Sequence, residues 1–307
     1  MGRVKKNKYK KLIRHNWRLY VLMLPALIWL IIFAYYPMYG LLISFKDYKG
    51  SLGILGSPWA TPVWKHFSAF FSTSIAKNVI VNTVVLSILT ILFSFPIPII
   101  FALLLNQIQG ERKRKLVQTI SYAPYFVSNV VVVSIMNVIC APSGFVNTII
   151  QQFIGRPLLL MSSAEYFRTM YIVSNIWQTM GFSAIVYIAA LTGISPEYHE
   201  AAVMDGATKF QRILHVDIPL IMPTIIIMLI LALGNIMTVG YEKVYLMQAG
   251  TNTQVSEIIS TYVYKVGLQN AQYSFATAVG FFNALVNFVI LVIANQITKK
   301  TSDISIF

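Results

Sequence analysis

The sequence predicts an all-α integral membrane protein with six transmembrane helices and a cytoplasmic helix-glycine-helix loop. Three observations lead to this fold class. Hydrophobic residues make up 57% of the 307-residue chain and charged residues only 11%, which is too apolar for an ordinary globular domain. Apolar runs long enough to cross a bilayer are separated by polar segments. Most bases flank these runs, so the net charge of +14 reflects membrane topology and we expect no nucleic acid partner.

The N-terminal part of the chain is basic and then strongly apolar. Residues 1–18 form a basic tail without an acid, expected on the cytoplasmic side against anionic membrane lipids. A first transmembrane helix should run from Leu19 to about Ser44, followed by an outer loop, so residues 19–76 form one unit. The single cysteine, Cys140, excludes an internal disulfide.

Two further spans are expected on either side of a basic cluster at 111–115. The second span should cover about Lys77 to Gln107, with a kink at Pro96 and Pro98. The third should cover about Val117 to Cys140. An apolar piece at 145–154 lies in the outer segment that follows and is too short to cross.

The last three spans are expected at about 166–194, 220–247 and 273–297, with a short cytoplasmic C-terminus at 299–307. An even number of spans places both termini on one side of the membrane. The positive-inside rule assigns that side to the cytoplasm, because bases are about twice as frequent in the inner segments as in the outer ones.

The polar stretch at 195–219 lies between two apolar runs. Ser195 is a good N-cap and Pro196 suits the first helical position. Gly206 supplies a left-handed residue where the helix can end. A second short helix should run from about Thr208 until Pro219 stops it. With its acids and bases, this loop is suited to contact another protein, although an amphipathic helix pair lying on the membrane is an alternative.

Polar side chains at membrane depth suggest a substrate path, because they usually face a bundle interior or a wet cavity. One stripe on the fourth span combines amides, a hydroxyl and an aromatic ring: Asn175, Gln178, Thr179 and Phe182. A similar stripe on the fifth span holds Asn235, Thr238 and Glu242. Such groups suit sugar hydroxyls and the apolar faces of sugar rings. The alternative is that they only join helices by hydrogen bonds.

Glu242 is the one charged candidate at depth, which favours a neutral substrate. It could equally form a solvated ion pair with Lys243 at the outer end of its span. The sequence has no phosphate-binding glycine loop, no histidine-cysteine cluster with metal-ligand spacing and no nucleophile-base arrangement. We therefore expect no catalytic residues, no metal and no cofactor in this chain. An ion channel or an intramembrane enzyme is a weaker alternative, since no repeated filter or charged ring is evident.

Three short elements of the polar stretch carry a family resemblance. They are Glu200-Ala201-Ala202, Asp205-Gly206-Ala207 and Val216-x-Ile218-Pro219. In this order and spacing they resemble the EAA loop of bacterial ABC importer permeases, the binding-protein-dependent type with the MetI-like fold. With Asn78, Asn82 and Thr83 at the start of the second span, the chain is most similar to the sugar and oligosaccharide branch. The resemblance covers about residues 77–298, which would be the permease core.

The resemblance implies a transport subunit of the bacterial plasma membrane that works by alternating access. Its partners would be a second homologous permease, two ATPase subunits that carry ATP and Mg, and an external binding protein that delivers the sugar. A permease for another neutral solute or a peptide is an alternative. The residues that would couple to the ATPase are Glu200, Ala201, Ala202, Asp205, Gly206 and Pro219.

Overall fold

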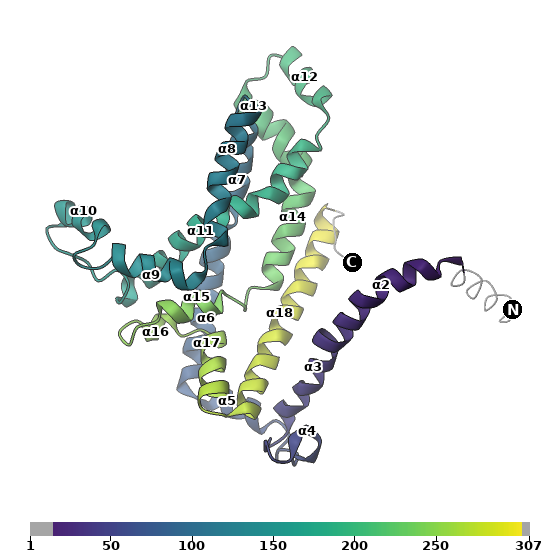
Figure 1. Cartoon of the computed structure of the whole chain (residues 1–307), viewed down its shortest axis with the longest axis vertical. Coiled ribbons are helices and arrows are strands. Elements are labelled where there is room, and N and C mark those ends of the chain that lie inside the picture. The colour runs from purple at the N-terminus through teal and green to yellow at the C-terminus, as the bar shows by residue number, and fades with distance from the viewer. Residues whose placement is uncertain (1–14, 303–307) are drawn as a thin grey trace.

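The computed structural model describes residues 15–302. Most of the predicted basic tail and the last residues of the C-terminus lie outside this range. Within this range, every regular secondary-structure element is a helix, and β pairing is limited to an isolated bridge between Lys46 and Trp59. The all-α class is therefore confirmed, and Figure 1 shows an elongated molecule with α12 and α13 at one end and α4 and α5 at the other.

Five helical segments between residues 15 and 302 are long and apolar enough to cross a membrane. They are Trp17–Phe45, Ser74–Asn106, Ala164–Thr192, Lys209–Gly234 and Tyr273–Lys300. A sixth crossing is reached only if a bent helix pair, Glu111–Phe126 and Asn129–Ile139, is counted as one span.

The first segment consists of α2 (Trp17–Leu30), a π-helical turn, α3 (Tyr36–Met38) and a 3-10 turn that ends at Phe45. None of the residues of α2 is buried, and Figure 1 shows the purple helix diverging from the bundle, so that only its lower end approaches α18.

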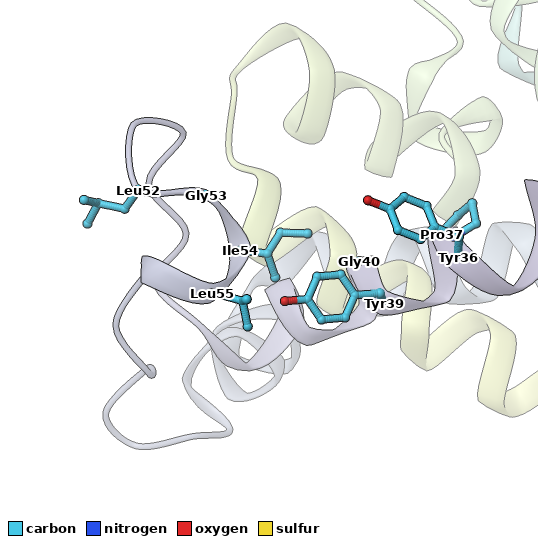
Figure 2. A pocket seen from close by; sticks show the side chains of 8 residues that line it. All are labelled: Tyr36, Pro37, Tyr39, Gly40, Leu52, Gly53, Ile54 and Leu55. Carbon is cyan, nitrogen blue, oxygen red and sulfur yellow. The ribbon is translucent and has the colours of Figure 1, made fainter. Parts of the chain in front are cut away.

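A recess of about 470 Å³ lies where this lower end meets α4 (Gly53–Gly56). Figure 2 shows Tyr39 beside Ile54 and Leu55, while Leu52 points away from them. All of the lining residues are uncharged.

The second span is interrupted where its prolines predict. α5 (Lys65–Ser72) precedes it, α6 covers Ser74–Ser94 and α7 covers Pro96–Asn106. Pro96 lacks the N–H that would bond to Leu92, and its ring would clash with that carbonyl, so the regular helix breaks at Phe95.

The expectation of one continuous third span at 117–140 is wrong. α8 (Glu111–Tyr122) passes into a short 3-10 turn, and α9 (Asn129–Ile139) then leaves at 95°. Pro124 opens the 3-10 turn, and the Ser128 side chain accepts a hydrogen bond from the Val131 N–H to start α9 as a new helix. α10 (Phe145–Ile154) follows at the predicted place and protrudes from the bundle (Figure 1).

The fifth span also differs from the expectation at both ends. Pro219 does not stop the helix. A π-helical turn at Ile213–Asp217 precedes it, in which the Ile218 N–H donates to the Ile213 carbonyl. Pro219 therefore falls in the first turn of α14 (Ile218–Gly234), where a missing N–H is tolerated.

The fifth helix ends at Gly234, thirteen residues before the expected Met247. A Cβ on Gly234 would lie 2.7 Å from a terminal carbon of the Leu291 side chain, so α14 packs closely on α18 at this point. Residues 235–240 are not helical, and α15 (Tyr241–Met247) follows them as a separate helix.

The remaining elements complete the bundle. They are α11 (Ala164–Thr192), α12 (Pro196–Met204), α13 (Lys209–Arg212), α16 (Thr253–Ser256), α17 (Ile259–Tyr264) with a π-helical turn to Gln269, and α18 (Tyr273–Ser302).

The helix α11 is the structural centre of the bundle. Near the elbow end, its residues Ala184 and Tyr187 pack with Ile221 of α14. Further along, Phe167 and Tyr171 belong to a second core cluster with residues of α6, α9 and α15. A helix held at both ends by buried apolar contacts is a rigid support for the polar stripe that it carries.

Candidate functional site

The loop between α11 and α14, which we call the elbow (residues 195–219), lies at one end of the molecule (Figure 1). α12 begins at Pro196 as predicted, with Ser195 extended in the N-cap position, but the Ser195 side chain makes no capping hydrogen bond. The helix start therefore depends on Pro196 and on Glu197 in the first turn.

The glycine turn of the elbow is confirmed in detail. Gly206 has a φ of +77°. The Gly206 N–H donates to the Val203 carbonyl and the Ala207 N–H donates to the Ala202 carbonyl, which is the Schellman arrangement of a helix C-terminus. A capping box that the sequence analysis missed then starts α13, where the Thr208 and Gln211 side chains each bond to the other's backbone N–H.

Most residues of the elbow are exposed, because the rest of this chain does not cover them. Of the predicted coupling residues, Ala202 is half-buried and the others are exposed, namely Glu200, Ala201, Asp205, Gly206 and Pro219. Large apolar side chains are exposed beside them, including Met204 at 88% and Phe210 at 72%. An exposed patch of this kind commonly marks an interaction surface.

One buried acid connects the two halves of the elbow. Asp217 is fully buried, and its Oδ1 lies 3.3 Å from Nε2 of His199 on α12. An acid in the first part of an otherwise apolar span is the signal that could have identified it, because such groups are costly to bury without a partner.

A cavity of about 460 Å³ lies near the middle of α11. Three elements form its wall: the turn after α8, the polar stripe of α11, and the start of α15. The lining residues are Tyr125, Phe126, Val127, Ser128, Asn129, Tyr171, Asn175, Gln178, Thr179, Gly240, Glu242 and Lys243. The wall offers amides, hydroxyls, aromatic rings and two charged groups, and this combination can bind a polar solute without reacting with it.

The structure brings most of the predicted stripe of α11 to this cavity. Asn175, Gln178 and Thr179 line it, and Asn175 also donates to Ser94 Oγ at 3.4 Å. Phe182 is outside the lining and stacks on Tyr125 with ring centroids 3.9 Å apart. Phe182 therefore does not line the cavity itself but supports the Tyr125 ring, which does.

The predicted stripe on the fifth span does not exist, because the helix ends before it. Asn235 donates to the Leu231 carbonyl at 3.1 Å and Thr238 accepts a hydrogen bond from Asn287 Nδ2 at 2.8 Å. Asn287 Oδ1 accepts in addition from the Met237 N–H at 2.8 Å. Asn235 and Thr238 thus belong to the connection between α14 and α15 and are not among the residues that line the cavity.

The charged residues of α15 behave differently from the expectation. Glu242 does not pair with Lys243, since its carboxylate accepts a 2.6 Å hydrogen bond from Asn129 Nδ2. Lys243 is not a solvated base at an outer span end, because it is only 3% exposed and its Nζ donates to Gln178 Oε1 at 3.0 Å. A straight fifth span would place Lys243 at its outer end, whereas α14 ends at Gly234 and Lys243 lies on the separate helix α15.

A multi-span membrane protein with an exposed helix-glycine-helix elbow and a polar cavity beside its central helix belongs to the class of transport permeases. Residues 67–303 match the family model described as "Binding-protein-dependent transport system inner membrane component". The chain belongs to this family, and it is a transport permease subunit of the ABC importer type.

Two curated relatives of similar length come from Bacillus subtilis (strain 168). The polygalacturonan/rhamnogalacturonan transport system permease protein YteP is 40% identical over 298 residues, which cover 97% of this chain and 92% of the relative. Protein LplB is 40% identical over 295 residues, 96% of this chain and 92% of the relative.

Solved structures agree with these relatives. A chain of a bacterial ABC transporter that imports the acidic polysaccharide alginate superposes with a TM-score of 0.87 at 40% identity, and the match covers 96% of this chain and 99% of that one. A second structure, of a bacterial alginate ABC transporter in complex with an alginate-pentasaccharide-bound periplasmic protein, gives a TM-score of 0.86 at 40% identity and the same coverage.

Proposed function

We propose that this chain forms half of the translocation path for a sugar or oligosaccharide in an ATP-driven importer of the bacterial plasma membrane. The observation that carries the proposal is the cavity beside α11, where Asn175, Gln178 and Thr179 present amide and hydroxyl groups next to the ring of Tyr125. These groups suit a saccharide, which needs paired donors and acceptors and an apolar surface for its ring faces. Relatives named for polygalacturonan/rhamnogalacturonan and alginate support this substrate class.

The elbow is proposed to dock into a cleft of an ATPase subunit. None of the residues of its helix α12 is buried and most are exposed, and the small side chains of Ala201 and Ala202 would allow a close approach. Glu200 is exposed and would face a basic group there. ATP and Mg would bind to the ATPase, so this chain would contribute motion and binding without hydrolysis of its own.

The working cycle we propose is alternating access. ATP binding would close a pair of ATPase subunits, the elbow would pass this motion to α11 and α14, and the spans of this chain and of a second homologous permease would open outward. An external binding protein would then deliver the sugar, and hydrolysis would restore the inward-facing state. Asp217 and His199 would help to keep α12 attached to the helix that it moves.

The proposed orientation places the elbow and both termini in the cytoplasm. In Figure 1, α2 and α18 both rise from the end of the molecule that holds α4 and α5 and reach about mid-height, so that the start of α2 and the end of α18 point the same way, as expected for an even number of crossings. The basic residues at 112–115 lie near the elbow end, in the first turns of α8, in agreement with the positive-inside rule.

The test is a gentle affinity purification of the full chain from its native membrane, followed by identification of the proteins recovered with it. We expect an ATPase and a second permease, and we expect the variant Glu200→Arg to lose the ATPase while it keeps the second permease. Glu165→Arg is the matched control, because Glu165 is equally exposed but lies at the start of α11, far from the elbow along the helix. Recovery of the chain alone or as a homo-oligomer would contradict the importer assembly.

A further inference from the structure

Lys243 is a buried lysine without a carboxylate partner among the described residues. Its side chain is 3% exposed, and burying an ammonium group is costly unless an anion or several hydrogen bonds compensate. Among residues 15–302, no carboxylate lies within 4.0 Å of its Nζ. The charge therefore has no counter-ion in the described part of the chain.

The hydrogen bond to Gln178 holds the ammonium group but does not neutralise it. Gln178 is fixed because its Nε2 donates to the Val127 carbonyl at 2.9 Å, which leaves Oε1 to accept from Lys243 Nζ at 3.0 Å. An ammonium group has three donors. Within the described residues this bond uses one donor, and Lys243 is among the residues that line the cavity, so the other two donors are left for a bound anion.

The only other charge on the cavity wall is directed elsewhere. Glu242 is exposed and is held by Asn129, so its charge is partly screened by solvent. The wall otherwise consists of neutral amides, hydroxyls, aromatic rings and apolar side chains. A single buried ammonium group in such surroundings balances one negative charge, whereas a doubly charged phosphate would keep one charge without a counter-ion.

We propose that Lys243 binds a carboxylate of the transported sugar, so that the substrate is an oligosaccharide of uronic acids. This inference rests on the proposed function and adds the charge of the substrate and the residue that selects it. It replaces the expectation of a neutral substrate, which assumed that Lys243 was solvated. Gln178 acts as a positioning residue, because it fixes the ammonium group on the cavity wall.

The experiment uses the assembled importer, with its ATPases and binding protein, in proteoliposomes. The probes are trigalacturonate, which has one carboxylate per sugar, and the same trisaccharide with its carboxyl groups reduced to alcohols. The affinity of the binding protein for each probe is measured separately, and uptake is compared at equal occupancy. The variants are Lys243→Gln, Lys243→Arg and the surface control Lys77→Gln, which removes an exposed lysine of α6.

We expect Lys243→Gln to lower trigalacturonate uptake by about tenfold or more, the scale of a lost charge-assisted hydrogen bond. The neutral probe should be transported by Lys243→Gln at least as well as by the original chain. Lys243→Arg should keep part of the uptake, and Lys77→Gln all of it. Stimulation of the ATPase by the loaded binding protein should persist in all three variants, because docking at the outside does not involve the cavity.

Two outcomes would overturn the inference. Equal losses for both probes in Lys243→Gln would mean that Lys243 only joins α15 to α11. Preference of the original chain for the neutral probe, or for a phosphorylated sugar used as a third probe, would exclude the carboxylate while the importer function stood. If the original chain transported no saccharide, the proposed function itself would fail, and the binding-protein affinities would show this separately.

Discussion

The elbow and the cavity are built by opposite kinds of contact. In the elbow, the hydrogen bonds that set its shape join residues at most five positions apart, such as Ala207 and Ala202. In the cavity, Lys243 and Gln178 are 65 positions apart and Glu242 and Asn129 are 113 apart. The elbow is exposed, and we propose that a partner protein covers it, whereas the cavity wall is fixed by the packing of the chain itself.

This difference predicts where each region is sensitive to mutation. Changes in helix packing should alter the cavity and leave the elbow turn intact. Changes in backbone conformation at the elbow should leave the cavity intact and interrupt coupling. The predictions below are arranged to separate these two effects, beginning with the largest.

The largest effect on the cavity is expected from a substitution of Gly181, which lies beside the polar stripe of α11. A Cβ at this position would lie 2.1 Å from the backbone oxygen of Ser121 on α8, so α8 and α11 would have to move apart. Overpacking typically costs roughly 1–3 kcal/mol, and a contact with backbone atoms belongs at the upper end of this range because they cannot move aside easily. We expect Gly181→Ala to lower the thermal stability of the purified complex clearly and to abolish uptake.

Gly193→Ala is the matched control for Gly181→Ala. It adds the same methyl group at the end of the same helix, where the nearest atom is the Ala190 oxygen at 3.4 Å. Its stability should stay close to that of the original chain. If the two variants were equally stable, the close contact between α8 and α11 would not be what shapes the cavity.

A second effect on the cavity should come from Asn287, which supports the connection that carries Lys243. Asn287→Ala would remove the acceptor of the Met237 N–H and the donor to Thr238. An unsatisfied buried group costs about 1–3 kcal/mol. We expect weaker substrate uptake with ATPase binding retained, since the elbow is far from this connection.

Asn283→Ala, one turn earlier on α18, tests whether loss of an amide in this helix is harmful in general. The Asn283 Oδ1 is buried without a hydrogen-bond partner among the described residues. Its removal should therefore have little effect on stability or uptake. A larger loss in Asn283→Ala than in Asn287→Ala would contradict the role given to the 235–240 connection.

The elbow should respond to Gly206→Val. Nothing lies within 4 Å of a Cβ built at Gly206, so the effect is conformational: a left-handed residue costs roughly 1–2 kcal/mol when it carries a side chain, and more when it is β-branched. We expect membrane insertion and complex stability to remain, while uptake falls by about tenfold.

Gly206→Asn separates backbone conformation from close approach. Asparagine tolerates the left-handed region, so this variant should keep most of the uptake. Gly250→Val, in an open position without a positive φ, should have no effect on coupling. If Asn failed as badly as Val, contact with the docked partner would explain the role of Gly206 and the turn itself would not.

The same contrast explains how much of the molecule was predictable. The elbow glycine, the start of α12 and the place of α10 follow from residues next to each other, so the sequence predicted them. Pro219 does not stop the helix because a π-helical turn precedes it, and the residues next to Pro219 do not predict that turn. The bend of 95° after α8 was missed for a related reason, since an apolar run looks the same whether it continues or turns.

The cavity was predictable only in part. The periodicity of α11 placed Asn175, Gln178 and Thr179 on one face, because helical spacing is local. Lys243 is buried on α15, which starts as a separate helix after α14 has ended beside α18, and the Asn287 side chain holds the connection between the two helices. Such long-range contacts have no signature in the neighbouring residues, so the sequence leaves a solvated ion pair of Glu242 and Lys243 open and does not predict a buried lysine.

The smallest effect is expected from a substitution of Phe182, at the edge of the cavity. Phe182 stacks on Tyr125 with an interplanar angle of 5°, and such a pair contributes about 1 kcal/mol beyond its buried area. Phe182→Leu should let the Tyr125 ring move and should raise the KM for saccharide a few-fold, with the maximal rate and the stimulation of the ATPase unchanged. Phe126→Leu is the comparison, because the Phe126 ring meets Phe182 edge-on at 6.1 Å and lines the cavity itself. A change of rate without a change of KM in Phe182→Leu would mean that this ring acts on the moving helices, and the separation between the cavity and the coupling path would then not hold at α11.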